Sequence, residues 1–500
     1  MKNLIDILNS VNDVRVAVVG DLMLDKYVWG EVTRISQEAP IPVLNVTYNE
    51  VRPGGSGNVI YNLTELGATV YSCGVVGNDK DGETLINEIS KLKTDVTGIF
   101  KDNSRTTTVK TRMMGHLRSA GKGIQQLLRV DYEDRHCISL EQENKMTQYL
   151  ENVAQNCDVF IIADMDKGLL TDGVYHKIRD LSKKYSIPVL IDPKLDGNYS
   201  QYKGFTAITP NRYETELATN IKITDIESLK IAGKKLIDML DMEYALITVD
   251  KDGMFLFNKD YDYDIISTSP REVNDVSGAG DVVISVLGFL IGAGKSFNDS
   301  ARIANIAAGI EVGKLGATPV SKEEITNEIL LRHDPFSFKI KEIDSLLATL
   351  NCHRKKGEKI VFTNGCFDLL HIGHIEYLKF SRLQGDVLIV GLNSDSSISK
   401  LKGRNRPIIN HKERAMLLAA LADVDYVTIF NEDTPKNLIK LIRPDVLVKG
   451  EDWRNAGVVG REFVESYGGE VVLAPLVGGI STSSIVSRIA EKHSPTIPTI

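Results

Sequence analysis

The sequence has few cysteines, and they form no recognisable metal-binding or disulfide pattern. Its five cysteines are scattered over 500 residues, without a Cys-x-x-Cys pair or a Cys/His cluster, at Cys73, Cys137, Cys157, Cys352 and Cys366. We therefore expect neither a structural zinc site nor a disulfide framework, and a reducing compartment fits this usage.

Long apolar runs and an excess of basic residues are also absent. The longest uncharged run, Val282 to Gly294, is short for a membrane span and is typical of a buried helix. The first residues, MKNLIDILNS, are too polar for a signal peptide. A net charge of −8 argues against a broad surface for nucleic acid or anionic membrane. We expect a cytoplasmic protein with small-molecule partners and without nucleic-acid or membrane partners.

The chain is too long for a single hydrophobic core, and its pattern predicts two α/β domains. Short β-branched runs alternate with helical stretches, which is typical of a mostly parallel sheet covered by helices. The predicted strands are VRVAVVGD, VFIIAD, PVLIDPK, TAITPN and YALITVD, and then KIVFTNG, DVLIVGLNSD, VDYVTIF, DVLVKG and EVVLAP. A charged, glycine-poor stretch separates the two groups, so we expect domains at 1–325 and 357–500 with a linker at 326–356.

The string NDVSGAGD, from Asn274 to Asp281, precedes an apolar helix in the first domain. Gly278 and Gly280 would let backbone N–H groups turn toward an anion at a helix N-terminus. Asp281 could then accept a proton from a hydroxyl that attacks a phosphoryl group. A helix cap explains a lone Gly-x-Gly-Asp equally well.

Other polar motifs of the first domain follow predicted strands. In RPGGSGN a glycine-rich turn opens a helix, and VVGDLMLD places Asp21 and Asp25 where carboxylates could bind sugar hydroxyls. TPNRYETE ends a strand with Asn211 and Glu214, and IDPK ends another with Asp192 and Lys194, which suit a hydrated magnesium ion and phosphate charge respectively. Capping, a plain turn or solvation would suffice for any one of them alone.

GGSGN, DPK, PNRYE and DVSGAGD occur in an order that resembles the ribokinase-like sugar kinases of the PfkB type, over about residues 14–320. The resemblance implies a ribokinase-like α/β fold, with Asp281 as catalytic base and ATP and Mg²⁺ bound at the domain. The residues it implies for ATP are Asn211, Arg212, Tyr213, Glu214, Thr248, Gly253, Gly278, Ala279 and Gly280, with Glu214 and Asp192 for the metal. The residues that we expect at the sugar are Asp21, Asp25, Gly54, Gly55, Asn58, Arg34 and Lys167. Arg112 and Arg129 are further candidate cations for a phosphate that the sugar already carries. One departure is TVDKDG, where Asp250 stands in place of the family's usual glycine.

In the second domain, NGCFDLLHIGH contains two histidines, His371 and His374. A zinc site would need further ligands that the pattern does not supply, although Asp368 is nearby. Core histidines are a plain alternative, because apolar residues surround them. Both histidines nevertheless follow a strand end, and two imidazoles there could donate hydrogen bonds to a triphosphate as its charge grows.

Two further elements of this domain could hold phosphates. GGISTSSI offers hydroxyls and backbone N–H groups at a predicted helix start, or simply a capping sequence. VKGEDW and LKGRNRPI supply Lys449 and Lys402, which could instead be solvated.

FDLLHIGH, GLNSD, RPI with HKER, KGEDW and GISTSS together resemble the cytidylyltransferase-like nucleotidyltransferases, over about residues 359–488. The resemblance implies a smaller Rossmann-like domain in which His371 and His374 contact the transferred and leaving phosphates. The nucleotide-binding residues it implies are Asn364, Gly365, Phe367, Asp368, Lys402, Lys449, Gly450, Ser481, Thr482 and Ser483. Leu476 and Val477 stand where many relatives carry an arginine, which is a mild indication against CTP.

The order of both domains, with TRISQEAPIPV early and NIAAGIEVGKLG closing the first, resembles the bifunctional heptose kinase/adenylyltransferases of bacterial lipopolysaccharide synthesis. The resemblance implies phosphorylation of D-glycero-β-D-manno-heptose 7-phosphate at C1 and formation of ADP-heptose from heptose 1-phosphate and ATP. Met165 in DMDKG departs from the tyrosine expected of close relatives, which leaves room for another sugar phosphate. A second domain that uses CTP, or a catalytically silent sugar-phosphate sensor or scaffold, are the alternatives. Kinases of this type often pair through a lid, so we expect a homodimer.

Overall fold

The computed structural model describes residues 2–117, 124–268, 278–314, 316, 318–333, 336–403, 405–454, 457–475 and 488. The chain divides into two compact units, Met1–Ile329 and Leu330–Ile500. The ten strands predicted from the sequence are all present, five in each unit. No helix in the described part of the chain combines the length and apolar content that a membrane crossing requires.

The first unit is built on a nine-stranded sheet in the order β13-β12-β11-β10-β9-β8-β1-β4-β5. Its strands are β1 (Arg15–Gly20), β4 (Thr69–Gly77), β5 (Asp95–Asp102), β8 (Val159–Ala163), β9 (Val189–Asp192), β10 (Ala207–Ile208), β11 (Tyr244–Thr248), β12 (Met254–Asn258) and β13 (Tyr263–Ile266). All neighbours pair in parallel except β12 and β13, which add an antiparallel edge. Chain order reverses between β1 and β8, and ligands of such sheets bind at the carboxyl ends beside that reversal.

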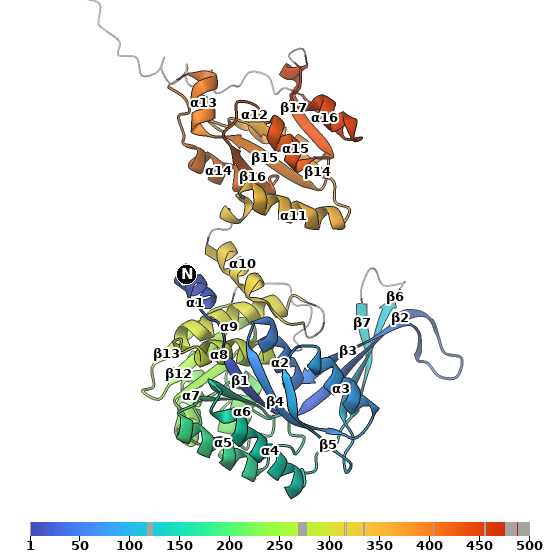
Figure 1. The fold of residues 1–500 in the computed structure, drawn as a ribbon, viewed down its shortest axis with the longest axis vertical. Coiled ribbons are helices and arrows are strands. Elements are labelled where there is room, and N and C mark those ends of the chain that lie inside the picture. Colours follow the sequence, from blue (N-terminus) through green and yellow to red (C-terminus); the bar gives the residue numbers. More distant parts are fainter. Residues whose placement is uncertain are drawn as a thin grey trace, which may run out of the picture. The chain divides into compact units, whose positions relative to one another are not determined.

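Helices cover both faces of this sheet (Figure 1). They are α1 (Lys2–Asn9), α2 (Ser56–Glu65), α3 (Lys80–Ser90), α4 (Leu140–Ala154), α5 (Asp172–Tyr185), α6 (Arg212–Thr219), α7 (Ile226–Leu240), α8 (Ala279–Gly292), α9 (Phe297–Glu311) and α10 (Lys322–His333). Successive residues of β1 alternate between two apolar clusters, because side chains of a strand point to opposite faces: Val16 and Val18 join one cluster, and Ala17 and Val19 join the other.

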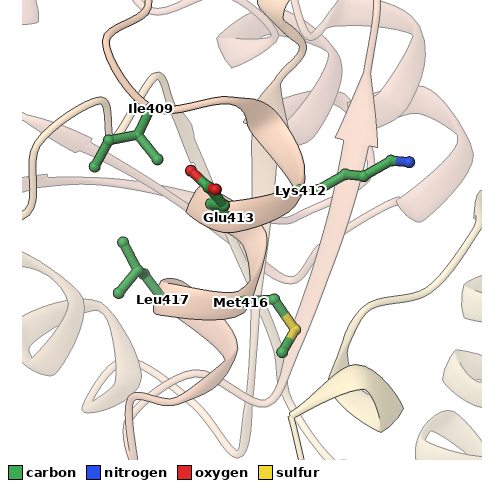
Figure 2. Close-up of a pocket in the computed structure, with 5 residues that line it drawn as sticks. All are labelled: Ile409, Lys412, Glu413, Met416 and Leu417. Carbon is green, nitrogen blue, oxygen red and sulfur yellow. The ribbon is translucent and has the colours of Figure 1, made fainter.

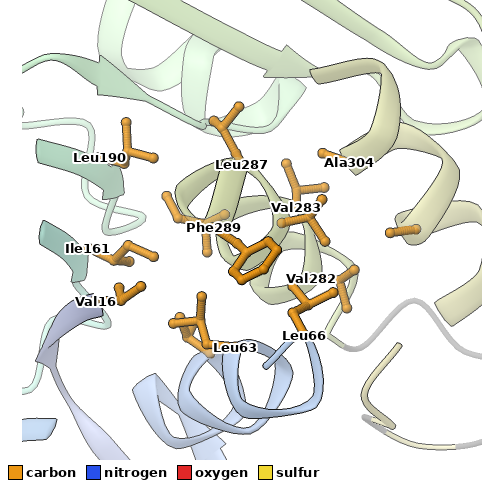
Figure 3. Close-up of a cluster of buried hydrophobic side chains, with 14 of the residues drawn as sticks. Val16, Leu63, Leu66, Ile161, Leu190, Val282, Val283, Leu287, Phe289 and Ala304 are labelled. Atoms are coloured by element: carbon orange, nitrogen blue, oxygen red, sulfur yellow. The ribbon is translucent and has the colours of Figure 1, made fainter. Parts of the chain in front are cut away.

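Helix α8 lies inside the first of these clusters, as its unbroken apolar sequence predicts. Phe289 and Leu287 of α8 pack between strand residues such as Ile161 and α2 residues such as Leu63 (Figure 3). The helix is fixed on several sides, and its N-terminus therefore has a defined place at the end of the sheet.

A second, four-stranded sheet in this unit was not predicted from the sequence. Its order is β3-β2-β6-β7, formed by β2 (Leu22–Ile35), β3 (Pro42–Gly55), β6 (Thr108–Leu117) and β7 (Ile124–Tyr132). These long strands reach away from the nine-stranded sheet (Figure 1). We call them the lid sheet. Only Asp21 separates β1 from β2, so the lid sheet starts at the carboxyl end of a central strand.

The second unit has a five-stranded parallel sheet in the order β16-β15-β14-β17-β18. Its strands are β14 (Ile360–Gly365), β15 (Val387–Asn393), β16 (Tyr426–Phe430), β17 (Val446–Gly450) and β18 (Glu470–Ala474). Its helices are α11 (Ile343–Lys355), α12 (Ile372–Arg382), α13 (Asp395–Lys402), α14 (His411–Ala419), α15 (Lys436–Ile442) and α16 (Arg461–Ser466). Chain order reverses between β14 and β17, so their carboxyl ends are the expected ligand site.

The stretch 326–356, expected to be a linker, contains the end of α10, the short helix η3 (Ser337–Lys339) and α11. Leu346 and Leu350 of α11 are buried in the apolar cluster of the second unit, beside residues of α15. Much of that stretch therefore belongs to the second compact unit.

Two candidate active sites

Asp281 stands in the first turn of α8, beside the reversal point of the first sheet. Gly278 precedes the helix with a φ of 104°, a conformation that suits glycine, and offers no side chain to cap the first turn. The side-chain amide of Asn58 donates a hydrogen bond of 2.7 Å to Asp281 Oδ2. The Asp281 carboxylate is thus directed toward α2 and does not cap its own helix.

The pKa of Asp281 is raised to about 6. Burial is the main cause, Asp25 raises it further, and the hydrogen bond from Asn58 and the charge of Lys110 oppose the shift. A carboxylate with this pKa is ionised at neutral pH and is a better proton acceptor than an exposed aspartate.

Asp25 of the lid sheet lies close enough to Asp281 to raise its pKa, and it pairs with a cation. Its Oδ1 accepts a 2.7 Å hydrogen bond from Arg112, and both side chains are largely buried. A Cβ on Gly54 would lie 2.6 Å from Asp25 Oδ2, so any side chain at that position in the GGSGN turn would displace the Asp25 carboxylate. Lys110 is close enough to act on both Asp25 and Asp281, and its own pKa is lowered by burial.

Asp21, which we expected at the sugar, is buried and binds the backbone of the loop at residues 165–167. Its Oδ2 accepts hydrogen bonds from the backbone N–H groups of Met165 (2.9 Å) and Lys167 (3.2 Å). Burial and the neighbouring Asp164 raise its pKa to about 6. A Cβ on Gly55 would lie only 2.6 Å from the backbone oxygen of Asp21. These contacts assign Asp21 to the junction between the sheet and the GGSGN turn.

The TPNRYETE motif forms the N-terminus of α6. Asn211 and Glu214 make a reciprocal capping box, with the Asn211 side chain accepting from the Glu214 N–H at 2.9 Å and Glu214 accepting from the Asn211 N–H at 2.8 Å. Thr248 pairs with Asn211 through a parallel bridge. The capping alternative is therefore realised, and it also fixes this loop beside the end of β11.

Asp250, which departs from the usual glycine, has a φ of 51°. Aspartate tolerates this left-handed conformation better than most residues. Its Oδ2 accepts a 3.1 Å hydrogen bond from Arg212, which also donates to Asp252 at 3.1 Å. Gly253 follows with a φ of 98°, and a Cβ there would meet the Ile266 carbonyl at 2.1 Å. Arg212 thus connects the two loops, while Tyr213 beside it is exposed.

Asp192 is the last residue of β9 and lies close enough to Asp281 and Glu214 to be affected by their charges. Its pKa is raised well above the usual value by burial and by the charges of Asp281 and Glu214. Carboxylates that repel one another in this way fit a hard cation, because oxygen ligands and negative charge are what Mg²⁺ requires. Within the described residues no cluster of three or more His, Cys, Asp or Glu stands ready as a complete metal site.

The remaining first-unit candidates differ in their surroundings. Lys167 is buried and pairs with Glu133 at 2.8 Å, which is the largest cause that lowers the pKa of Glu133 to about 2. Arg34 is exposed near the far end of β2, nine residues beyond Asp25 and thus about 30 Å along the strand. Ala279 and Gly280 open α8, and a Cβ on Gly280 would meet nothing within 4 Å.

In the second unit, His371 and His374 lie together at the start of α12. His371 is the N-cap residue, and the two rings stack with centroids 3.9 Å apart. Phe367, at a φ of 43°, packs against His374 at 5.2 Å. Both histidines are half-buried and are not enclosed in the core.

Both imidazoles are uncharged at neutral pH. Burial lowers the pKa of His371, and burial followed by the charge of His371 lowers that of His374 to about 4, with a further small effect of Lys402. The Nδ1 atoms of both rings are buried without a hydrogen-bond partner among the described residues. Such atoms are rare in folded proteins and indicate a site that a ligand completes.

Asn364 and Lys449 bring the ends of β14 and β17 to the same place. Lys449 Nζ donates a 3.0 Å hydrogen bond to the Asn364 carbonyl, while Asn364 Oδ1 is a third buried atom without a partner in the described chain. Burial lowers the pKa of Lys449 to about 8, and its ammonium lies 5.5 Å from the Trp453 ring centroid. Gly365 and Gly450 end the two strands.

The loop that carries the histidines is fixed by two arginines. Asp368 accepts a 2.6 Å hydrogen bond from Arg406 and bonds from the N–H groups of Ile408 and Ile409, which make Asp368 an anchor. Arg414 is fully buried and donates to the Cys366 carbonyl at 2.5 Å and to Asp395 at 2.7 Å. Neither the Asp368 pairing nor the burial of Arg414 could be read from the sequence, because both depend on a partner many residues away.

The other predicted nucleotide contacts are less defined. Lys402 ends α13 and is exposed, yet close enough to act on His374. Ser481, Thr482 and Ser483, with the GISTSS segment, lie outside the described residues. An apolar hollow along α14 is lined by Ile409, Lys412, Glu413, Met416 and Leu417 (Figure 2). It includes neither histidine and is not part of the candidate site.

Sequence reasoning missed several residues at these sites. Lys110 lies opposite Asp25 in the parallel β2–β6 pairing, and Arg52 lies opposite Asp25 on the other side. A search for long strands of alternating pattern around Asp25 could have placed all three on one face.

Both units match known families. The family described as pfkB family carbohydrate kinase matches residues 14–324, and the family described as cytidylyltransferase-like matches residues 362–486. Phosphofructokinase-2 from Escherichia coli, solved with substrates and products, aligns with a TM-score of 0.54 over 64% of this chain and 99% of its own. Its sequence is 14% identical, so this likeness establishes the fold of the first unit alone.

Relatives with both units are much closer in sequence. A protein of Geobacter sulfurreducens named bifunctional protein HldE is 45% identical over 492 residues, which cover 98% of this chain and 99% of that protein. A protein of the same name from Pelobacter propionicus is 45% identical over 493 residues, 99% of each chain.

Proposed function

The chain belongs to the family of the bifunctional HldE proteins, and from this membership we propose that its two units catalyse two ATP-dependent steps toward ADP-heptose. The first unit would phosphorylate D-glycero-β-D-manno-heptose 7-phosphate at C1. A separate phosphatase would remove the 7-phosphate, and the second unit would then join heptose 1-phosphate to AMP from ATP, with release of pyrophosphate. We assign these activities to residues 1–325 and 357–500.

One contrast carries the proposal: a half-buried carboxylate with a raised pKa in one unit, and two uncharged imidazoles with unsatisfied Nδ1 atoms in the other. The first arrangement suits removal of a proton from a hydroxyl nucleophile. The second suits stabilisation of charge on phosphate oxygens when the nucleophile is already an anion. A sugar hydroxyl must lose a proton as it attacks, whereas a sugar phosphate is already ionised and needs none removed.

In the kinase step, Asp281 accepts the proton of the C1 hydroxyl as that oxygen attacks the γ-phosphorus of ATP. Asn58 holds the carboxylate in place, and the uncapped N-terminus of α8 faces the negative phosphates. Asp192 and Glu214 are the residues that would hold Mg²⁺, which neutralises phosphate charge when bound.

In the transferase step, the sugar phosphate attacks the α-phosphorus of ATP and pyrophosphate leaves. His371 and His374 bind phosphate oxygens through their ring nitrogens, and Lys449 adds positive charge at the neighbouring strand end. Arg414 and Arg406 position the loop that carries the histidines through the Cys366 carbonyl and Asp368.

We also propose that the protein is a cytoplasmic homodimer. The lid sheet supports the dimer, because exposed apolar side chains such as Ile35 and Ile41 lie at the tip of the β2–β3 arm. Light scattering coupled to size exclusion would measure twice the chain mass of 55.3 kDa if the proposal holds.

The test of the two activities uses purified protein with ATP and synthetic sugars. We expect ADP to form with heptose 7-phosphate, and pyrophosphate to form with heptose 1-phosphate. Replacing the sugar by another hexose or heptose phosphate, and ATP by CTP in the second reaction, measures specificity. A protein that binds heptose 7-phosphate but releases neither ADP nor pyrophosphate would be a sensor, and the proposal would be wrong.

A further inference from the structure

Asp164 is a buried acid that the mechanism above does not use. It follows β8 directly, and its side chain is enclosed by the first unit. Its Oδ2 accepts hydrogen bonds from the hydroxyl groups of Tyr175 (2.6 Å) and Tyr202 (2.7 Å), and its Oδ1 accepts from the Asp166 N–H at 3.0 Å. Both carboxylate oxygens are thus bonded within the protein, so the role of Asp164 is to hold other groups in place.

The two tyrosines that donate to this acid are closely matched. Tyr175 belongs to α5, Tyr202 ends the short helix η1 (Ser200–Tyr202), and both side chains are buried. Burial and the charge of Asp164 raise the pKa of both phenols, so both stay protonated at neutral pH and can donate. Their rings meet edge to face, with centroids 5.7 Å apart.

Tyr202 differs from Tyr175 in a second contact. Its hydroxyl oxygen also accepts a 3.2 Å hydrogen bond from the backbone N–H of Lys194. A phenol that donates to a carboxylate becomes a better acceptor, because neighbouring hydrogen bonds polarise one another. Among the described residues, the Tyr175 hydroxyl makes no hydrogen bond to the loop at 193–199. Tyr202 therefore connects the buried acid to this loop, and Tyr175 does not.

The Lys194 N–H is the first that the chain offers after β9. Pro193 has no N–H, and the ladder between β9 and the two-residue strand β10 has already ended at this point. Immediately before the proline, the Asp192 carbonyl accepts from the Asp164 N–H at 3.0 Å. Asp164 and Tyr202 thus fix the backbone on both sides of Pro193.

Asp192 and Lys194 are the residues that we assign to the metal ion and to phosphate charge. Asp192 lies close enough to Asp281 for the charge of Asp281 to raise its pKa. Lys194 Nζ pairs with Asp196 at 2.8 Å and lies 3.9 Å from Asp166 Oδ1. A displacement of reacting groups by about 1 Å can slow an enzyme about 100-fold, so the place of this backbone should affect the rate.

We propose that Tyr202 is a positioning residue of the kinase, and that Asp164 fixes it for this role. The pair sets the backbone at Asp192 and Lys194, and thereby their distance from Asp281 and from the phosphates of ATP. This inference rests on the proposed function, because it takes Asp192 and Lys194 as contacts of the metal ion and of ATP.

The decisive comparison is between Tyr202→Phe and Tyr175→Phe. Each change removes one hydrogen bond to Asp164 and keeps the ring, so both should lower the denaturation midpoint of the first unit by a similar amount. Tyr202→Phe should also lower the kcat of ADP formation about tenfold and raise the free Mg²⁺ concentration at half-maximal rate about fivefold. Its KM for heptose 7-phosphate, and all three quantities in Tyr175→Phe, should change less than about twofold. Equal kinetic effects of the two changes would overturn the positioning role.

The anchoring of the loop can be measured without turnover. Amide hydrogen exchange of a peptide that covers residues 189–199 reports on the Lys194 N–H. This amide should exchange about tenfold faster or more in Tyr202→Phe, because its acceptor is lost, and at the wild-type rate in Tyr175→Phe. Unchanged exchange in Tyr202→Phe would mean that the bond does not hold the loop, and the inference would be wrong.

The same peptide separates this inference from the proposed function. With Mg²⁺ and the non-hydrolysable β,γ-methylene analogue of ATP, residues 189–199 should become protected in the wild type. Half-maximal protection should need about fivefold more nucleotide in Tyr202→Phe and the wild-type amount in Tyr175→Phe. If the wild type formed no ADP with heptose 7-phosphate while the variants still differed in this way, the proposed function would fail and the positioning role would stand. Equal nucleotide requirements in the two variants of an enzyme that does form ADP would overturn the positioning role alone.

Discussion

The two units build their sites in different ways. In the first unit, Asp281 of α8 meets Asn58 of α2 and Asp25 of the lid sheet, and it follows both of them by more than 200 residues in the chain. In the second unit, Asn364, His371 and His374 lie within eleven residues of one strand, loop and helix. The first site thus depends on the packing of distant elements, whereas the centre of the second comes from one strand, loop and helix, to which β17 adds Lys449.

Burial acts on both sites in the same direction, with opposite chemical results. It favours the uncharged form of any titratable group, so it raises the pKa of Asp281 to about 6 and lowers that of His374 to about 4. The carboxylate becomes a stronger base, and the imidazole remains an uncharged ligand for phosphate. Similar surroundings thus serve proton removal in one unit and charge stabilisation in the other.

The largest expected effect separates the two sites completely. Asp281→Asn should lower the kinase rate by at least about 10³-fold, because proton removal is lost, and leave pyrophosphate release unchanged. His374→Ala should lower the transferase rate by about 10²–10³-fold and spare the kinase. ADP and pyrophosphate are assayed separately for each variant.

Matched controls are available in each unit. Asp172→Asn changes an exposed acid in the first turn of α5, and His353→Gln changes a histidine of α11 that pairs with Glu358 and Tyr426. Both activities should survive in both controls. Loss of both activities from either Asp281→Asn or His374→Ala would mean that the sites are not independent.

Next in size is the dependence of the transferase loop on Arg414. Replacement by leucine removes a fully buried partner of Asp395 and leaves the Cys366 carbonyl unpaired, so the second unit should lose about 3–5 kcal/mol of unfolding free energy. Denaturant titration with each activity as a probe should show an earlier midpoint for the transferase alone. Arg461→Leu removes an exposed ion pair with Glu465 and should lower the free energy of unfolding by less than about 0.5 kcal/mol. Equal shifts for both variants would refute a special role of Arg414.

The pH profiles should differ between the two activities. The kinase requires ionised Asp281, so its kcat/KM should be constant above the pKa of about 6 and fall about tenfold for each pH unit below it. The kcat/KM of the transferase should not fall between pH 6 and pH 5, because the pKa of His374 is about 4 and its ring stays uncharged between pH 5 and 8. Identical profiles for the two reactions would contradict the contrast in pKa.

The smallest effect concerns stability. The folded-state pKa of Asp281 is higher than its unfolded value, so the ionised form opposes folding above pH 6, and this penalty disappears as the pH falls below that value. Asp281→Asn should therefore stabilise the first unit by about 1–3 kcal/mol at pH 7.5, given about 1.4 kcal/mol per pKa unit. At pH 5 the stabilisation caused by Asp281→Asn should be smaller than at pH 7.5. Chemical denaturation at both pH values measures the difference, and a gain that grows at low pH would refute the assignment.

The sequence predicted the parallel strands because they are short apolar runs that end in polar residues, a pattern set by burial on both faces. It also predicted the start of α8 from the positions of its glycines. The lid sheet was missed because its strands are half exposed and mix charges with aromatics, as at Lys110 and Trp29. The pairings of Asp368 with Arg406 and of Asp21 with the Met165 N–H were missed because they join residues that only the folded chain brings together.

Asp21 alone joins β1 to β2, and it is buried. Its backbone oxygen accepts from the Ser56 N–H at the start of α2, and its carboxylate accepts from two N–H groups of the 165–167 loop. The base of the lid sheet is therefore tied to α2 and to that loop through a single residue, so a substitution of Asp21 would loosen three segments of the first unit at once.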